Sequence, residues 1–342
     1  MDFKEFNLHN KLIKFGITPK ILELLPFKPE EIIPFYDEGF ILESSQGSKA
    51  LWFQRGREAS LACQIELLEI CQQHGFDGFL YPLALNDHRY YAELDEERWF
   101  YLTTWSDLRK IYFSSWEDIK AVINLLADFR STFLKRGFLF SIPDRRPNNL
   151  LLKYQESFNQ LISFGMLAKH RLRPTEFDKI FLSYLPELLQ QSKQAINIIE
   201  NSDYFELLSK LTPKDIIINN LTRHNIKMTV DGKAVCLRLN AYQWNLPIID
   251  LAILLIKTGR SGEWSENWYL NIINEYQQYF KINPSELQII YSYLTFPWSI
   301  YRLASRYYFN RVEWTVRSFI DKMERLLGDE GKRVGFLKNL PI

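Results

Sequence analysis

Alternating hydrophobic and polar residues mark the first third of the chain as a region of short strands. Two stretches with apolar and aromatic residues, Phe35–Glu43 and Ala50–Phe53, are predicted to be strands joined by a polar turn. Three more, Phe79–Leu85, His88–Glu93 and Trp99–Thr103, complete a predicted five-stranded antiparallel sheet. This part of the chain should therefore be built on a sheet.

Elsewhere the hydrophobic positions recur with the period of an α-helix. Leu61, Ile65 and Leu68 share one face of a helix that Gly75 ends. Near the C-terminal end, Asn283 precedes Pro284 and stands three residues before a glutamate, which is a typical helix start. The chain after residue 252 is predicted to be helical. The other predicted helices are Phe6–Phe15, Arg57–His74, Trp116–Phe133, Leu152–Leu167 and Phe177–Glu200.

The stretch Ile216–Ala252 interrupts the helices with a different pattern. A short apolar run ends at Asn219, and a polar loop leads to a hairpin with a predicted turn at Asp231–Gly232. A helix should begin near Pro247 or Asp250. We expect this strand, loop, hairpin and helix to organise the functional site.

Composition limits the possible functions. The 342 residues are enough for two lobes with a sizeable core. The net charge of +1 is too small to attract the chain to nucleic acid or anionic lipid. Glycine is scarce, at 14 residues or about 4% against a usual value of about 7%. The three cysteines lack metal-ligand spacing. No apolar run is long enough to span a membrane, and the amphipathic N-terminus does not resemble a signal peptide.

The pattern of Ile216–Ala252 resembles the catalytic core of the aminoglycoside phosphotransferase/choline kinase group, within the wider protein-kinase-like fold. That group reads H-G-D-x-x-x-x-N-I, a short hairpin, I-D-F/W-D/E and then D-L-A, and this frame fits here without a gap. The resemblance implies an α+β, two-lobe fold. An antiparallel sheet with helix C would form the N-lobe, over residues 1–104, and a mainly helical part with the short hairpin would form the C-lobe, over 105–342.

The resemblance assigns the family's functional positions to changed residues. The catalytic aspartate falls on Asn220, and the metal-binding aspartate of the second motif falls on Arg238. The metal-binding asparagine is kept as Asn225, and the aspartate that braces the loop is kept as Asp250. The loop chemistry is therefore altered within a retained frame.

The same holds for the predicted N-lobe. The phosphate-binding lysine of the third strand falls on Trp52, and Lys49 is a poor substitute because an offset of three residues reverses the face of a strand. Glu69 best matches the glutamate of helix C, although a solvated helix carboxylate is the plainer interpretation. The glycine-bearing phosphate loop is represented by Gly39 alone.

These replacements predict the loss of phosphoryl transfer. Asn220 can hydrogen-bond a hydroxyl group but cannot accept its proton, and an arginine at position 238 should repel Mg²⁺. From the sequence we expect a protein that is not an enzyme, without catalytic residues, bound metal or cofactor. We also expect Arg238 to pair with a carboxylate, a carbonyl or Asn220/Asn225, or to face solvent, because an unpaired buried cation is unfavourable.

A narrower resemblance rests on the C-terminal helices. Leu294–Trp298, Tyr307–Tyr308 and Phe177–Lys179 are similar to motifs of the CotS-type spore coat protein family, including its YsxE- and YutH-like members. The resemblance implies a pseudokinase with a structural or interaction role in spore coat assembly. It would be made in the mother-cell cytoplasm and deposited in the spore coat with other coat proteins as partners.

The sequence leaves two other functions to be considered. The alternative is a phosphotransferase of the aminoglycoside phosphotransferase/choline kinase type, acting on a small molecule or a coat protein and using Glu69, Asn220 and Asn225 in altered roles. A nucleic-acid binder has only the aromatic content and short basic runs such as Lys169–Arg173 in its favour. We therefore expect no nucleic-acid partner.

Overall fold

The computed structural model describes residues 16–35, 39–134, 147–262 and 264–340. The chain forms two compact units, which we describe separately. Unit 1 comprises Met1–Tyr112, Asn124–Arg145 and Thr222–Tyr242, and unit 2 comprises Phe113–Ile123, Arg146–Leu221 and Gln243–Ile342. The predicted helix Phe6–Phe15 lies outside the described residues.

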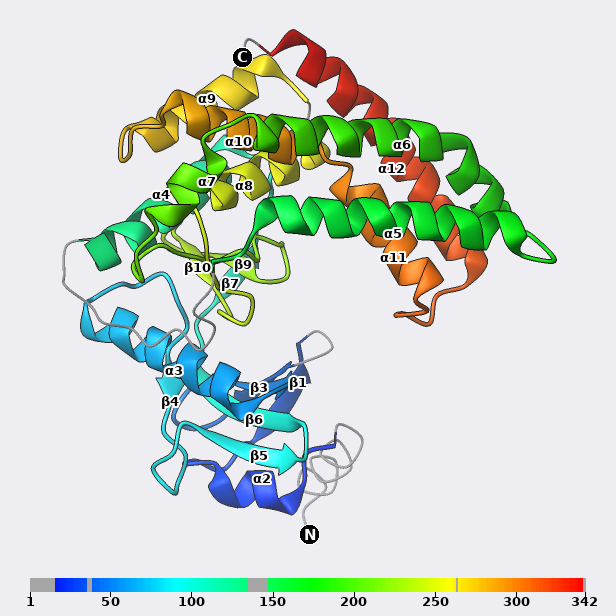
Figure 1. Ribbon diagram of the computed structural model, residues 1–342. Helices are drawn as coiled ribbons and strands as arrows, with labels where there is room; N and C mark the ends of the chain where they lie inside the picture. Colours follow the sequence, from blue (N-terminus) through cyan, green and yellow to red (C-terminus); the bar gives the residue numbers. More distant parts are fainter. Residues whose placement is uncertain (1–15, 36–38, 135–146, 263, 341–342) are drawn as a thin grey trace. The chain divides into compact units, whose positions relative to one another are not determined.

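An antiparallel sheet of six strands forms the centre of unit 1 (Figure 1). Its order is β1-β2-β3-β6-β4, and β5 also pairs with β6. The sheet predicted from the sequence is therefore confirmed, with one strand more than expected, because β1 (Glu31–Pro34) lies before the predicted strand Phe35–Glu43, which contains only β2. The strands are β1 (Glu31–Pro34), β2 (Gly39–Glu43), β3 (Lys49–Arg55), β4 (Pro82–Leu83), β5 (Tyr91–Asp95) and β6 (Arg98–Thr104).

Strand β3 shows how the two faces of this sheet are covered. Side chains alternate along a strand, and Leu51 packs in a cluster with Ile21 of helix α2 (Pro19–Leu24). The neighbouring residue Trp52 packs in a second cluster with Leu61 and Ile65 of helix α3 (Glu58–Gln73). Helix α3 matches the helix predicted over Arg57–His74.

The predicted hairpin belongs to unit 1. Strands β9 (Ile226–Thr229) and β10 (Ala234–Cys236) pair antiparallel, and β7 (Leu108–Lys110) pairs with the other edge of β9. The turn contains Gly232 at φ +83°, a conformation that glycine adopts readily, which confirms the Asp-Gly turn. The N–H of Cys236 also donates to the carbonyl of Gly78 at 2.9 Å, so the hairpin groups with the sheet-bearing unit although the sequence places it in the second lobe. The division into lobes at residue 104 stays a prediction.

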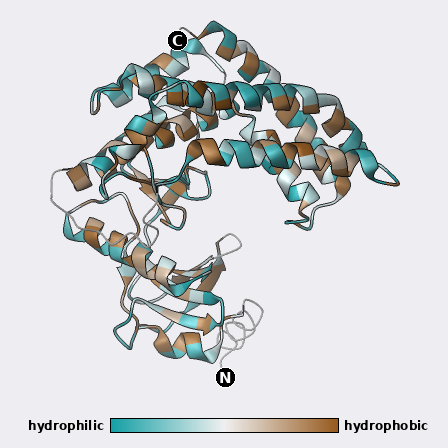
Figure 2. Ribbon diagram, viewed as in Figure 1, coloured by the Kyte–Doolittle hydropathy of each residue, from teal (hydrophilic) through white to brown (hydrophobic). Residues whose placement is uncertain are grey.

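Unit 2 is mainly helical. Its long helices alternate hydrophobic and hydrophilic positions (Figure 2). The helices that follow Thr175 and Asn283 begin with complete capping boxes, and the start at Asn283 was predicted. Two short strands, β8 (Ile216–Ile217) and β11 (Gln243–Trp244), pair antiparallel beside these helices. Helix α4 (Trp116–Leu134) belongs to both units. The other helices are α5 (Leu150–His170), α6 (Glu176–Glu200), α7 (Tyr204–Ser209), α8 (Ile248–Ser261), α9 (Glu266–Gln277), α10 (Pro284–Thr295), α11 (Trp298–Tyr308) and α12 (Val316–Asn339).

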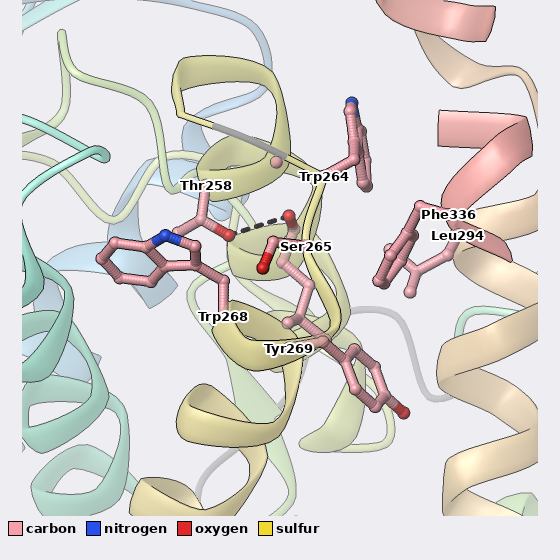
Figure 3. A pocket seen from close by; sticks show the side chains of 9 residues that line it. Thr258, Trp264, Ser265, Trp268, Tyr269, Leu294 and Phe336 are labelled. Atoms are coloured by element: carbon pink, nitrogen blue, oxygen red, sulfur yellow. Dashed lines mark hydrogen bonds between the residues drawn. The ribbon is translucent and has the colours of Figure 1, made fainter. Parts of the chain in front are cut away.

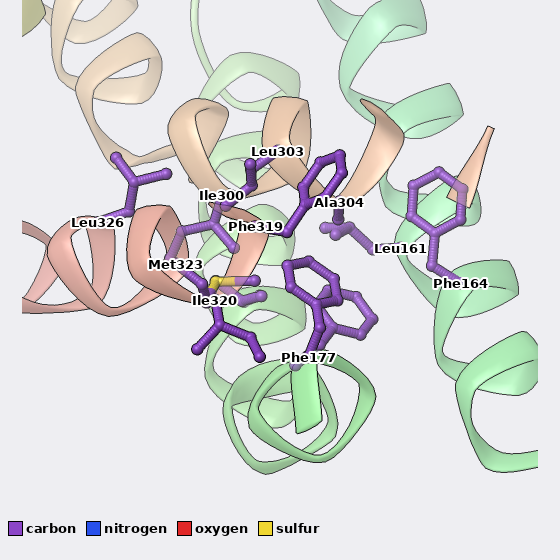
Figure 4. Close-up of a cluster of buried hydrophobic side chains, with 12 residues drawn as sticks. Leu161, Phe164, Phe177, Ile300, Leu303, Ala304, Phe319, Ile320, Met323 and Leu326 are labelled. Carbon is purple, nitrogen blue, oxygen red and sulfur yellow. The ribbon is translucent and has the colours of Figure 1, made fainter. Parts of the chain in front are cut away.

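The core of unit 2 explains two of the C-terminal motifs. Helices α5, α6, α11 and α12 contribute its buried side chains, including Phe177 (Figure 4). At its edge Tyr308 donates a hydrogen bond to Asp178 at 3.0 Å, and the ring of Tyr307 lies 4.0 Å from that of Phe177. Two motifs separated by about 130 residues in sequence therefore meet in one network, where they stabilise the helical packing. No helix among the described residues is both long and apolar enough to cross a membrane.

Candidate functional site

The loop after β8 is held by the first turn of α8. Asp250 accepts hydrogen bonds from the backbone N–H groups of Ile218 and Asn219, both at 2.8 Å. Asn219 adopts φ +58°, in the left-handed region that glycine and asparagine tolerate best. Asn219 stands where the resembling motif has its glycine, so the residue has changed to another that accepts this conformation. Asn220, the position of the catalytic aspartate, follows it and is half-buried.

Burial changes the pKa of the Asp250 carboxyl group. It is 4% exposed, and burial raises its pKa to about 7 although the two backbone N–H donors act in the opposite direction. The group therefore titrates close to neutral pH. Its role as a brace of the loop, which the resemblance implied, agrees with its hydrogen bonds in unit 2.

Asn225 braces the hairpin of unit 1. Its side-chain oxygen accepts from the N–H of Arg238 at 3.0 Å, and its amide nitrogen donates to the carbonyl of Arg238 at 2.9 Å. The same nitrogen lies 3.2 Å from the sulfur of Cys236. Both ends of this amide thus fix the backbone of Arg238.

Trp52 fills the position of the expected lysine with a buried indole. It is 3% exposed, and its ring N–H donates to the hydroxyl of Thr103 at 2.9 Å. A Cβ atom on Gly39, which is paired with Trp52 in the neighbouring strand, would lie 2.6 Å from the indole ring. The glycine of the former phosphate loop therefore makes room for the tryptophan.

The guanidinium group of Arg238 lies over this indole. Its central carbon is 5.2 Å from the ring centroid, which is within the range of cation–π attraction. The sequence predicted polar partners or solvent for Arg238 and did not anticipate the ring. The available signal was the joint replacement of lysine by tryptophan on β3 and of aspartate by arginine on the hairpin.

The other expected site residues of unit 1 have different partners. Glu69 on α3 hydrogen-bonds the phenol of Tyr90, and this bond raises the pKa of Tyr90. Lys49 donates to the backbone carbonyls of Gln46 and Ser48 at 2.9 and 3.4 Å, in the turn between β2 and β3. Glu69 and Lys49 therefore contribute to local structure, while Trp52, Arg238 and Asn225 come together. Asn220 and Asp250 belong to unit 2.

The residues present do not fit a magnesium site. Mg²⁺ prefers carboxylate oxygens and water in octahedral geometry. The hairpin has Arg238 at the position where the resembling motif has its metal-binding carboxylate, and the side-chain amide of Asn225 is hydrogen-bonded to the backbone of Arg238. Within the described ranges, no three His, Cys, Asp or Glu side chains lie close enough to bind a metal ion.

A surface hollow in unit 2 has little chemistry of its own. It is lined by aromatic residues that include Trp264, Trp268 and Phe336 (Figure 3). The hydroxyl of Thr258 donates to the carbonyl of Leu255 at 2.9 Å, and the indole N–H of Trp264 donates to Asp329 at 2.9 Å. The hydroxyl of Thr258 and the indole of Trp264 are therefore engaged in the fold, and Ser265 and Tyr269 also line the hollow.

Comparison with known proteins identifies the fold. No protein-family model and no curated protein matches the chain. Among solved structures, an aminoglycoside phosphotransferase from Alicyclobacillus acidocaldarius is similar, with a TM-score of 0.78 and 18% identity over 94% of each chain. An AMP-bound spectinomycin phosphotransferase has a TM-score of 0.68 and 12% identity over 97% of this chain and 99% of that chain. A choline kinase from Streptococcus pneumoniae has a TM-score of 0.52 and 12% identity over 96% and 99%.

These matches confirm the predicted fold class and correct the prediction about activity. The prediction that the chain is not an enzyme is contradicted. The similar proteins are named as phosphotransferases and kinases, and the match extends over nearly the whole length of each chain. The narrower resemblance to CotS-type coat proteins stays a prediction. The chain has the α+β, kinase-like fold of aminoglycoside phosphotransferases and choline kinases.

Proposed function

We propose that the protein is a phosphotransferase of the aminoglycoside phosphotransferase/choline kinase type in which Arg238 is the cation that binds the nucleotide phosphates. The observation that carries the proposal is the position of Arg238. Its backbone is fixed by Asn225 and its guanidinium group is supported by Trp52. A positive charge has thus moved from the third strand of the sheet to the hairpin.

Arginine suits this role chemically. A guanidinium group stays charged, and its planar donors can bind two phosphate oxygens at once. The indole of Trp52 lies under the guanidinium group, 5.2 Å from ring centroid to central carbon, and adds a cation–π attraction. Trp52 itself supplies one donor, which Thr103 already accepts, so it cannot replace the lysine as a phosphate ligand.

Phosphoryl transfer depends mainly on positioning and electrostatic stabilisation, since its transition state is loose. In the proposed reaction the oxygen of a substrate hydroxyl forms a bond to the γ-phosphorus, and the bond to the bridging oxygen breaks to release the nucleoside diphosphate. The proton of the hydroxyl passes to a phosphate oxygen or to water, because the position of the family's catalytic aspartate is an amide, Asn220, which cannot accept a proton. Arg238 stabilises the charge on the leaving phosphates. Without a carboxylate base, we expect slow turnover.

A turnover assay tests the proposal. The purified protein is incubated with ATP labelled at the γ-phosphate, a panel of small hydroxylated metabolites and a spore-coat extract, and the label is followed into acceptors. Transfer that is lost in Arg238→Gln and kept in Lys49→Gln would support the assignment. Lys49→Gln is the matched control because it removes a cation of strand β3 whose ammonium group donates to the carbonyl of Gln46 at 2.9 Å. Equal transfer by wild type and Arg238→Gln, or no transfer to any acceptor, would contradict it.

Spore coat location stays a finer prediction, with other coat proteins as partners. It rests on the motifs of α6, α10 and α11, two of which form one network through Asp178 and Tyr308. In this case the acceptor would be a small molecule or a coat protein of the developing spore. Immunoblots of fractionated spores of the encoding organism would test the location, and recovery of the protein only from vegetative cells would count against it.

A further inference from the structure

The motif Leu294–Trp298 places a buried tryptophan at the start of α11. Trp298 is 3% exposed, and its ring lies 4.4 Å from that of Phe296 and 5.4 Å from that of Tyr293. The ring of Tyr154, from α5, lies 5.5 Å from Trp298 and stacks on Phe296. Trp298 is thus a rigid part of the contact between α5 and α11, which lie side by side (Figure 1).

Two cations from different helices lie over this one indole. The ammonium nitrogen of Lys153, on α5, is 5.1 Å from the ring centroid, and the guanidinium carbon of Arg302, on α11, is 5.9 Å from it. Part of each side chain is exposed to solvent, while protein atoms surround the charged ends, and the Nε of Arg302 donates to the carbonyl of Trp298 at 3.2 Å. In the described part of the chain, neither lies within ion-pair distance of a carboxylate. We call this pair the Lys153–Arg302 site.

This arrangement is unfavourable for the protein alone. Desolvation and the nearby charge of Arg302 lower the pKa of Lys153, and desolvation also lowers the pKa of Arg302. Two like charges held together without a counter-charge repel each other. Locally unfavourable groups of this kind are expected at functional sites, where a ligand supplies what the fold lacks.

The Lys153–Arg302 site is electrostatically linked to the loop of unit 2. Burial raises the pKa of the Tyr293 phenol to about 12. The charge of Arg302 lowers this pKa, and the charge of Asp250 raises it. Asp250 in turn holds Ile218 and Asn219, next to Asn220. Tyr293, whose ring lies 5.4 Å from that of Trp298, is therefore within electrostatic range of both Arg302 and Asp250.

We propose that Lys153 and Arg302 bind an anionic group of the acceptor substrate, so that the acceptor is a small molecule carrying a phosphate or carboxylate group. A guanidinium fork and a mobile ammonium group together match the several oxygens of such an anion. The same pair would repel a cationic aminoglycoside or choline. Assigning the anion to the acceptor rests on the proposed function, whereas anion binding itself does not.

Binding without nucleotide tests this assignment. The probes are glucose 6-phosphate for a phosphate group, gluconate for a carboxylate, glucose as the neutral sugar and kanamycin as the cation. Each is titrated at millimolar concentration in constant ionic strength, and the melting temperature is followed. We expect a saturable rise with one or both anions and none with glucose or kanamycin. The two anion arms identify which group is preferred.

Variants locate the binding. Lys153→Gln together with Arg302→Gln should weaken anion binding at least tenfold, while Arg238→Gln should leave it unchanged and so separate it from nucleotide binding. Lys193→Gln is the matched control, because Lys193 lies 5.8 Å over the ring of Phe158, on another part of α5 and α6. If the double variant does not fold, the single variants Lys153→Gln and Arg302→Gln serve instead.

Three outcomes would overturn the assignment. They are the absence of a shift with either anion, a shift that survives in the double variant, and a shift that Lys193→Gln reduces equally. Binding of kanamycin in preference to the anions would also contradict it. If anion binding depends on Lys153 and Arg302 but no phosphate transfer is found, the site stands as an anion site and the proposed function fails alone.

Discussion

Each unit holds a tryptophan with cationic side chains over its ring, and the two arrangements differ in their charge. In unit 1, among the residues that the structure describes, one cation, Arg238, lies over Trp52, whose N–H is bonded to Thr103. In unit 2 two cations, Lys153 and Arg302, lie over Trp298. The indole N–H of Trp298 is buried without an acceptor among the described residues, so packing alone fixes this ring.

The two sites therefore differ in whether a second positive charge lies over the same ring. The guanidinium group of Arg238 gains attraction from the ring of Trp52, and the Asn225 amide fixes the backbone of this arginine. A second cation on the same ring adds repulsion, which a bound anion would relieve. The first site should therefore contribute to stability, and the second should contribute little until an anion binds. The predictions below run from the largest expected effect to the smallest.

Trp52→Ala should have the largest effect. Removing a buried aromatic side chain from the cluster on α3 should lower the free energy of unfolding by about 3–5 kcal/mol, measured by chemical denaturation. Gly39→Ala should be strongly destabilising in the wild type, because the new Cβ atom would meet the indole at 2.6 Å. In the Trp52→Ala background Gly39→Ala should be nearly neutral. A full additional penalty there would show that Gly39 is needed for a reason other than the tryptophan.

Asp250 should give the stability a pH dependence. Its pKa is about 7 in the folded protein and near the ordinary value of 3.8 in the unfolded chain. Between these values the folded state binds more protons, so this group's contribution is full below about pH 4 and is lost as the pH rises through about 7. The slope approaches at most about 1.4 kcal/mol per pH unit. Unfolding measured from pH 4.5 to 7.5 should show this fall in the wild type and lack it in Asp250→Asn, and equal slopes would contradict the assignment.

Arg238→Gln should cost about 0.5–2 kcal/mol, since it removes a half-buried cation–π contact. Arg302→Gln should leave the melting temperature of the unliganded protein unchanged or raise it, because it removes repulsion as well as attraction. Thermal unfolding of both variants at low salt measures this contrast. Equal losses in the two variants would mean that the unit 2 pair is a structural contact like the first.

Asn219→Gly should have the smallest effect. Glycine adopts φ +58° without strain, while asparagine retains part of the penalty for the left-handed region. The variant should be more stable by at most about 1 kcal/mol, less the entropy that glycine adds to the unfolded chain. Asn219→Ala is the control and should be destabilising. An Ala variant as stable as the wild type would indicate that the loop does not require this conformation.

The sequence predicted the elements better than their partners. Periodicity located α3, the hairpin and the capped helix after Asn283, because local patterns determine these features. The frame of the loop could be recognised from the spacing of Asn225 and Asp250. The contact of Arg238 with Trp52 joins residues 186 positions apart, and no local pattern reports such a pair. For the same reason the sequence could show that the charges had changed but not that the arginine is supported by the tryptophan.

The loss of activity inferred from the sequence illustrates the same limit. Each replaced residue was judged by its own position, as a missing lysine, base or metal ligand. The structure adds that Asp250 holds the backbone of Ile218 and Asn219, next to Asn220, and that Asn225 holds the backbone of Arg238. The sequence shows each substitution alone, whereas the structure shows the hydrogen bonds that hold the backbone beside it.

Metal-free nucleotide binding tests the central claim most directly. Isothermal titration of ATP in the presence of EDTA should detect binding by the wild type and by Lys49→Gln, and a loss of at least tenfold in Arg238→Gln. Added Mg²⁺ should not strengthen binding by the wild type, because an arginine occupies the position of the metal-binding carboxylate. Absence of ATP binding in EDTA, or binding that requires Mg²⁺ and is indifferent to Arg238, would contradict the account.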